Sequence, residues 1–110
     1  MTPSELLKQY IYLHNYGIET ADFGPLMMIF GDNAVFEFED ARIGRFEGIE
    51  TIRGVFRRQA PTLAIMTGET TEMKTSVRAD YAAEDRPEER LGYIELEMYD
   101  DKIKKLFIGK

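Results

Sequence analysis

The sequence contains no cysteine, no tryptophan and only one histidine. The absence of cysteine excludes a disulfide framework, a thiolate metal site and a cysteine nucleophile. One histidine and scattered carboxylates give no spacing typical of a metal site, so we expect no bound metal. No motif for a cofactor is present either, and we expect none.

The sequence also lacks a long apolar run and an excess of basic residues. No segment approaches the ~20 apolar residues of a membrane span, and the polar N-terminal segment does not resemble a signal peptide. We therefore expect a cytoplasmic protein that does not contact membranes. Acidic residues outnumber basic residues 20 to 14, for a net charge of −6. This balance argues against nucleic acid as a partner, because phosphate binding requires clustered lysine and arginine.

The length and composition indicate one globular unit. The 110 residues are 44% apolar and 31% charged, which is typical of a folded chain. No repeat, linker or low-complexity segment interrupts it. We expect a single domain over 1–110.

The first sixty residues predict three helices. A capping box at Thr2–Glu5 and apolar residues at helical spacing predict a first helix that ends near Gly17. A second, short helix is expected over 22–30. A third is expected over 49–60, where Pro61 prevents its continuation.

The rest of the chain predicts strands, from residues that alternate between apolar and polar. The expected strand segments are 34–39, the residues around Phe46, 64–66, 73–79, 91–99 and 103–108. A polar stretch over 80–89 is expected to form a hairpin loop. Helices followed by antiparallel strands predict an α+β fold, with the helices packed on one face of a curved sheet.

The order of these elements, with the segment GDNAVFEFEDARIGRFEGIETIRGVFRR at Gly31–Arg58, resembles the nuclear transport factor 2-like superfamily. The nearest shapes are its SnoaL-like and ketosteroid-isomerase-like members. The resemblance implies a strongly curved, mixed, mostly antiparallel sheet that forms a cone around an internal pocket. The superfamily includes isomerases, dehydratases, polyketide cyclases, epoxide hydrolases and non-catalytic binding domains, so the fold does not decide the reaction.

Isomerases of this superfamily use a tyrosine on the first helix, a neutral acid on a late strand and a carboxylate base after the first strand. By resemblance, Tyr10 matches the tyrosine position and Glu95 falls near the acid position, where glutamate replaces the usual aspartate. The base position aligns with Phe38, which cannot move a proton. Glu37 and Glu39 flank it, but strand alternation points both away from its face unless the strand slips or bulges.

The residues themselves allow two interpretations. Tyr10 and His14 share one helical face, where the phenol could stabilise an oxyanion while the imidazole moves a proton. The alternative is a core tyrosine and a helix-edge histidine. Glu95 and Glu97 share one strand face, and burial beside Tyr93 would raise the pKa of a carboxyl group there. The alternative is a solvated glutamate face.

In these folds the outer face of the sheet is often an apolar dimer surface. That arrangement would turn Ile94, Leu96 and Met98 toward a second copy of the chain and Glu95 toward the pocket. We therefore expect a homodimer formed through the sheet face.

Together these observations predict an apolar, tyrosine-lined pocket for a hydrophobic small molecule. The candidate catalytic residues are Tyr10, His14 and Glu95, with Glu37 or Glu39 as other candidate bases. The candidate ligand-binding residues are Phe30, Phe38, Phe56, Met73, Tyr93 and Glu97. Two functions stay open: cofactor-free proton transfer next to a carbonyl, as an isomerase, dehydratase or polyketide cyclase, and a non-catalytic ligand-binding or dimerisation module.

Overall fold

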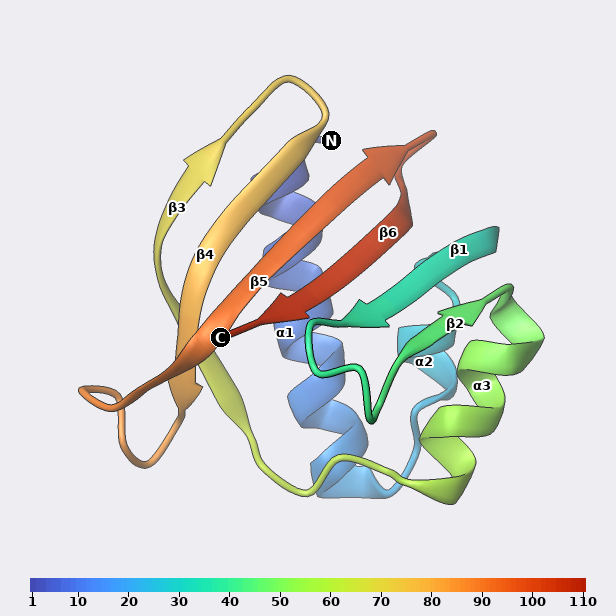
Figure 1. Ribbon diagram of the computed structural model, residues 1–110, viewed down its shortest axis with the longest axis horizontal. Helices are drawn as coiled ribbons and strands as arrows, with labels where there is room; N and C mark the ends of the chain where they lie inside the picture. Colours follow the sequence, from blue (N-terminus) through green and yellow to red (C-terminus); the bar gives the residue numbers. More distant parts are fainter.

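The computed structural model describes residues 1–110, in which three helices cover one face of a six-stranded sheet (Figure 1). The predicted α+β class is confirmed. None of the helices has both the length and the apolar character needed to cross a membrane. The elements, in chain order, are α1 (Pro3–Thr20), α2 (Gly24–Met27), β1 (Phe30–Phe38), β2 (Arg45–Glu47), α3 (Ile49–Arg58), β3 (Ile65–Glu72), β4 (Ser76–Ala83), β5 (Arg90–Tyr99) and β6 (Lys102–Gly109).

The sheet is mixed, as predicted. Its strand order is β2-β1-β6-β5-β4-β3, and only the pair β1–β6 is parallel. After the β1–β2 hairpin, α3 carries the chain to the far edge of the sheet, and successive hairpins return it until β6 lies beside β1. Helix α1 contacts β3, β4 and β5, whereas α3 contacts β1 and β2. The two long helices therefore cover different halves of the same face.

Helix α1 begins where the sequence predicts but continues beyond Gly17. The Glu5 N–H donates to Thr2 Oγ1 (3.1 Å) and the Thr2 N–H donates to Glu5 Oε1 (2.7 Å), which completes the capping box. Gly17 faces the interior, where its missing side chain makes room for the ring of Phe23. The glycine therefore serves close packing, and the helix ends at Thr20.

Two other boundaries differ from the prediction. The second helix is a single turn, and Phe30 begins β1 because it pairs with Ile103 of β6. Strand β4 runs on to Ala83, so the first four residues of the polar stretch expected as a loop are strand. Its polar and apolar residues alternate in register with β5, where Tyr81 pairs with Gly92. In both places, pairing with another strand decides the local structure.

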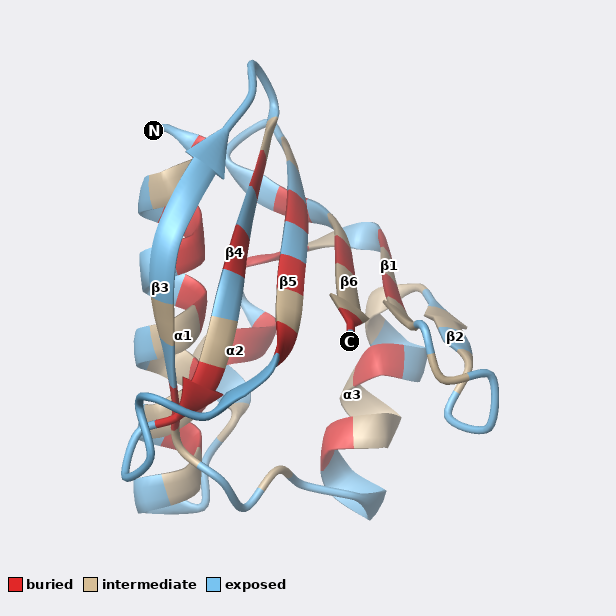
Figure 2. Ribbon diagram, turned by 60° about the vertical axis from the view of Figure 1, so that its left-hand side comes forward, coloured by how far each residue is buried: buried red, intermediate tan, exposed pale blue.

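The alternation of β5 is opposite to the one required by the predicted dimer surface. Ile94 and Leu96 are fully buried against the helices, and Glu95 and Glu97 are exposed on the other face of the sheet (Figure 2). The prediction that Ile94 and Leu96 face a partner is therefore wrong. Burial of the apolar residues decides the face, because a shift of one residue would place both glutamates in the core. The homodimer itself stays a prediction.

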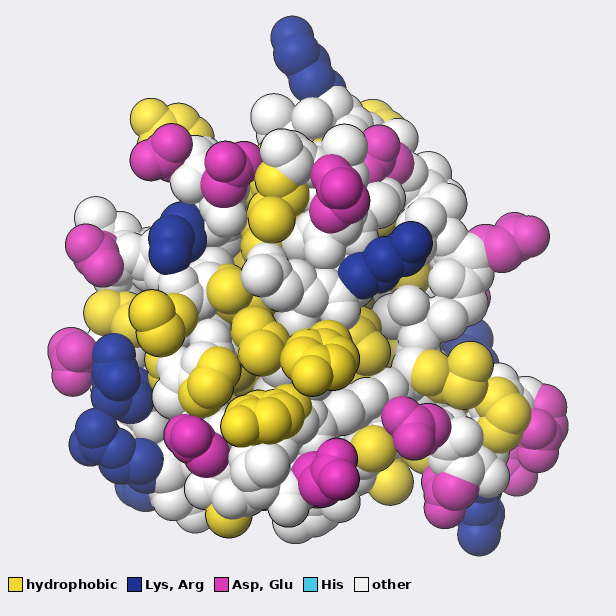
Figure 3. All heavy atoms as spheres, turned by 180° about the vertical axis from the view of Figure 1, so that it is seen from behind, with side chains coloured by type: hydrophobic (Ala, Val, Ile, Leu, Met, Phe, Trp, Pro, Cys, Tyr) yellow, Lys and Arg dark blue, Asp and Glu magenta, His cyan; other side chains and the backbone are white.

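The outward side of α1 carries an aromatic pair. Tyr12 and Tyr16 are 67% and 38% exposed, and their rings stack with centroids 6.4 Å apart. Seen from this side, hydrophobic side chains gather near the centre of the molecule, and charged side chains surround them (Figure 3). This helix therefore presents apolar side chains on its outer face as well as toward the sheet.

The packing of Phe23 on Gly17 predicts an unusual response to alanine. In most helices Gly→Ala stabilises by about 1 kcal/mol, but a Cβ at Gly17 would clash with Cδ1 of the Phe23 ring. We expect Gly17→Ala to lower the free energy of unfolding by about 1–2 kcal/mol, measured by urea denaturation. Gly54→Ala in α3 is the matched control, because its Cβ would meet only the flexible end of Arg58. A stabilised Gly17→Ala variant would contradict this packing.

Candidate functional site

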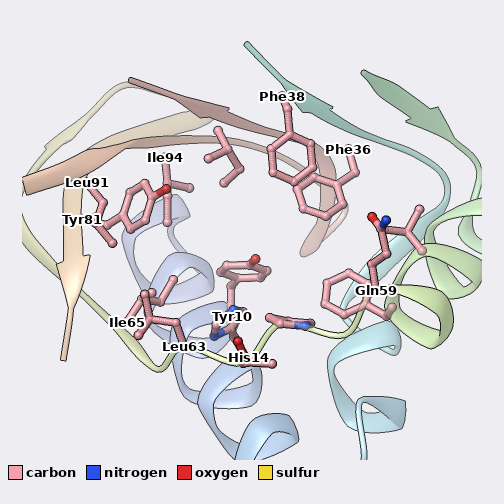
Figure 4. A pocket seen from close by; sticks show the side chains of 15 residues that line it. Tyr10, His14, Phe36, Phe38, Gln59, Leu63, Ile65, Tyr81, Leu91 and Ile94 are labelled. Atoms are coloured by element: carbon pink, nitrogen blue, oxygen red, sulfur yellow. The ribbon is translucent and has the colours of Figure 1, made fainter. Parts of the chain in front are cut away.

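A cavity of about 300 Å³ lies between the sheet and the two long helices (Figure 4). Its wall is mostly aromatic and aliphatic, and no lysine, arginine, aspartate or glutamate contributes to it. The segment 59–63 after α3 and the start of β5 form an exposed rim. The lining residues are Tyr10, His14, Phe36, Phe38, Val55, Phe56, Gln59, Pro61, Thr62, Leu63, Ile65, Tyr81, Leu91, Ile94 and Ile108.

Tyr10 of α1 places a hydroxyl group in this apolar space. The residue is only 3% exposed, and its hydroxyl points into the cavity (Figure 4) without a hydrogen bond to another protein group. Burial raises the pKa of the phenol, and the nearby Tyr81 contributes a smaller increase. Tyr10 is therefore neutral at physiological pH and has a hydrogen to donate to a ligand.

His14 lies one helical turn from Tyr10 on the same wall. Its ring centroid is 5.8 Å from that of Tyr10, and the residue is 6% exposed. Burial lowers the pKa of the imidazole, and a hydrogen bond with Asn15 partly opposes this effect. His14 is therefore uncharged near neutral pH, a form in which one ring nitrogen donates and the other accepts.

The side chain of Asn15 ties α1 to the first residue of β3. Its Oδ1 accepts from the Ile65 N–H (3.0 Å), and its Nδ2 donates to the Ile65 carbonyl (2.8 Å). The same Oδ1 lies 3.0 Å from His14 Nδ1, and Nδ2 lies 3.4 Å from Glu84 Oε2. Asn15 could not be predicted from the sequence, because its backbone partner is 50 residues away along the chain.

At the cavity, β1 contributes aromatic side chains and no carboxylate. Phe38 and Phe56, both expected from the sequence to bind a ligand, line this cavity. Glu37 lies on the outer face, where its Oε1 is 3.4 Å from Lys105 Nζ. Pairing of β1 with β2 is regular at Glu37, so no bulge turns this carboxylate inward. Glu39 follows the strand and does not line the cavity either.

Glu95 is not near Tyr10, and the predicted pair does not form. Its carboxylate is about half exposed on the outer face, where Oε2 lies 3.9 Å from Arg78 Nη1. Tyr93 shares that face, with the Arg78 guanidinium 3.8 Å above its ring, and Glu97 is exposed beside it. The reason is strand alternation, which turns Ile94 and Leu96 of β5 inward and Glu95 outward.

Two further predicted ligand contacts lie elsewhere. Met73 is 66% exposed in the turn between β3 and β4. Phe30 is 4% exposed and packs its ring edge-on against Tyr10, with centroids 6.4 Å apart, but it does not reach the cavity. It belongs to the core beneath the site.

Tyr81 and the rim are site residues that were not predicted from the sequence. Tyr81 lies in the stretch expected to be a loop, but it continues the inward series of Val77 and Ala79 on β4 and reaches the cavity wall. The alternation of apolar residues at Val77, Ala79 and Tyr81 is a sequence signal that could have predicted this position. Burial raises the pKa of Tyr81, so it too is a neutral donor. Gln59 and Leu63 carried no such signal, since they lie in an irregular segment.

The buried imidazole predicts a loss of stability in mild acid. Because the pKa of His14 is lowered in the folded protein from its ordinary 6.5, the unfolded chain binds the proton first. The contribution of His14 to the free energy of unfolding is therefore complete above pH 6.5. Below pH 6.5 the free energy of unfolding falls by up to about 1.4 kcal/mol per pH unit, until the pKa of His14 in the folded protein is reached. Urea denaturation at several pH values measures this, and His14→Gln should remove that slope. An NMR titration giving a folded pKa above 6.5 would contradict it.

No protein-family model matches the sequence, and no curated protein matches it. An NTF2-like protein from Anabaena variabilis superposes with a TM-score of 0.74 at 14% identity, covering 96% of this chain and 87% of the other. A candidate ketosteroid isomerase from Kribbella flavida has a TM-score of 0.64 at 16% identity, covering 99% of this chain and 80% of the other. A candidate polyketide cyclase from Sinorhizobium meliloti has a TM-score of 0.64 at 21% identity, covering 91% of this chain and 93% of the other. The chain therefore has the NTF2-like fold, as the sequence resemblance implied.

Proposed function

We propose that the protein binds an uncharged, largely apolar small molecule in the cavity between α1, α3 and the sheet. The observation that carries this proposal is that no lysine, arginine, aspartate or glutamate lies among the lining residues. A charged ligand would lose its hydration there without gaining a partner, at a cost of several kcal/mol. The sheet and helices would then form the cone predicted from the sequence, with the ligand inside it.

The polar groups of the wall suggest what the ligand carries. The Tyr10 hydroxyl has no partner within the protein, and Tyr81 is a second neutral donor on the opposite wall. A carbonyl oxygen would accept from Tyr10 and give the ligand a fixed orientation. A volume of about 300 Å³ lies at the small end of ligand pockets, which suits a molecule of one or two rings.

A second candidate function is proton transfer next to that carbonyl, and His14 favours it. An uncharged imidazole one turn from Tyr10 can take a proton from the carbon beside the carbonyl. The electron pair of the broken C–H bond moves to the carbonyl oxygen, which Tyr10 stabilises. Return of the proton at another atom would complete an isomerisation. If a hydroxyl group instead leaves the neighbouring carbon and takes the proton from His14, the product is water and the reaction is a dehydration. The names of the isomerase and cyclase neighbours agree with this chemistry.

The alternative to catalysis is a pocket that only binds. Phe38 lines the wall at the position of the usual carboxylate base, and Glu95 is unavailable as the neutral acid because it lies on the outer face. Catalysis would thus depend on His14 alone for proton transfer. The two functions differ in whether hydrogen is exchanged on a bound ketone.

The binding proposal predicts a selective loss in Tyr10→Phe. We expect this variant to bind 2-acetylnaphthalene about five- to tenfold more weakly, and 2-ethylnaphthalene with unchanged affinity, because only the ketone accepts a hydrogen bond. Fluorescence titration measures both. Tyr99→Phe is the control, since Tyr99 is 73% exposed and remote from the cavity. Equal losses for the two probes, or no binding of either, would overturn the proposal.

Hydrogen exchange separates the enzyme from the binding module. If His14 is a base, the wild-type protein should accelerate exchange of the methyl hydrogens of 2-acetylnaphthalene in D₂O, followed by mass spectrometry. His14→Gln should reduce the accelerated rate at least about 100-fold. Glu95→Gln should retain it, because Glu95 lies outside the cavity. Binding of the ketone without accelerated exchange would favour the non-catalytic module.

A further inference from the structure

The backbone of Ile65 fixes the orientation of the Asn15 side chain. A backbone N–H can only donate a hydrogen bond and a carbonyl can only accept one. The Ile65 N–H lies 3.0 Å from Oδ1 and the Ile65 carbonyl 2.8 Å from Nδ2. Exchanging the amide oxygen and nitrogen would place donor against donor and acceptor against acceptor. Oδ1 is therefore the atom that faces His14, and it is an acceptor.

This orientation determines which nitrogen of His14 carries the proton. His14 Nδ1 lies 3.0 Å from Asn15 Oδ1, which has no hydrogen to give. The hydrogen bond must therefore come from an N–H at Nδ1. A neutral imidazole has one N–H, so Nε2 holds a free lone pair. No protein group donates to Nε2, and His14 lines the cavity.

We propose that Asn15 is a positioning residue that fixes His14 as its Nδ1–H tautomer, so that Nε2 is the hydrogen-bond and proton acceptor of the cavity. The proposal rests on the proposed ligand-binding function and narrows its ligand class. Tyr10 donates and His14 accepts, so the ligand carries an oxygen acceptor and, near it, an O–H or acidic C–H donor. Phenols, enols and hydroxy ketones belong to this class.

An amide suits this task better than a carboxylate. The titratable groups around His14 are Tyr10 on its own helix and Tyr81 on β4, both neutral, and Glu84, which contacts the far side of the Asn15 amide. No carboxylate reaches the ring itself. An anionic partner at Nδ1 would select the same tautomer but would also favour the charged imidazolium. The neutral amide of Asn15 selects the tautomer and leaves His14 free to accept a proton.

The tautomer can be read directly, because the chain contains a single histidine. In the full chain labelled with ¹⁵N, long-range ¹H–¹⁵N spectra above the His14 pKa should show Nδ1 protonated and Nε2 unprotonated. Asn15→Ala should move the ring toward the Nε2–H tautomer that predominates in free histidine, and Asn33→Ala, an exposed asparagine on β1, should not. A protonated Nε2 in the wild type, or an unchanged tautomer in Asn15→Ala, would overturn the proposal.

Asn15→Asp covers the case in which Asn15→Ala fails to fold. We expect it to keep the Nδ1–H tautomer and to raise the pKa of His14, since its carboxylate accepts the same hydrogen bond and adds a charge. The tautomer of this variant separates the roles, because a carboxylate that did not accept from the ring would leave Nε2–H predominant whatever its charge did to the pKa. A predominant Nε2–H tautomer in this variant would therefore overturn the positioning role.

Ligand preference tests the acceptor itself. We expect the wild type to bind 2-naphthol about fivefold more tightly than 2-methoxynaphthalene, because only the naphthol donates to Nε2. Asn15→Ala should lose this preference and Asn33→Ala should keep it. Equal affinities in the wild type would overturn the ligand class. If neither probe binds while the wild-type tautomer is as stated, the proposed function fails and the tautomer assignment stands, so the two failures are distinguishable.

Discussion

The site depends on how two helices share one face of the sheet. α1 contacts β3, β4 and β5, α3 contacts β1 and β2, and the cavity occupies the gap that remains between the two helices. Side chains from both helices and from five strands surround this gap without filling it. Wider burial by either helix would stabilise the core and remove the cavity. The core is therefore less densely packed at the cavity than it would be if the two helices met.

The hydrogen bonds between Asn15 and Ile65 give this space its chemical asymmetry. Without them the wall would hold several neutral groups that can each rotate or exchange tautomers. With them, Tyr10 and His14 lie one helical turn apart on the same wall, where Tyr10 donates and His14 accepts. The link also joins the middle of α1 to the start of β3, where the chain enters the last four strands. Support of the scaffold and orientation of the imidazole thus share one side chain.

The sequence predicts local structure here better than it predicts the site. The capping box at Thr2–Glu5 and the alternation of β5 and β6 specify their elements, because the signals are local. The alternation of β5 also indicates that Glu95 faces solvent, as it does in the structure. Only the family resemblance implied that Glu95 faces the pocket. Phe30 begins a strand because it pairs with the distant Ile103, whereas the alternation that places Tyr81 on β4 is local and visible in the sequence. Asn15 and the rim could not be found, since their roles depend on contacts far along the chain.

The uncharged lining has a consequence for how a ligand arrives and leaves. With no fixed charge in the cavity, no electric field focuses ligands toward it, and association should proceed without steering and almost without dependence on ionic strength. The acidic groups counted in the net charge of −6 lie outside the cavity and would repel only anions. Differences in affinity between neutral molecules would then come from their dissociation rates. Molecules that form hydrogen bonds with both Tyr10 and His14 would dissociate more slowly. In the proposed function, the protein would select compounds by their low polarity and retain them by their pattern of hydrogen bonding.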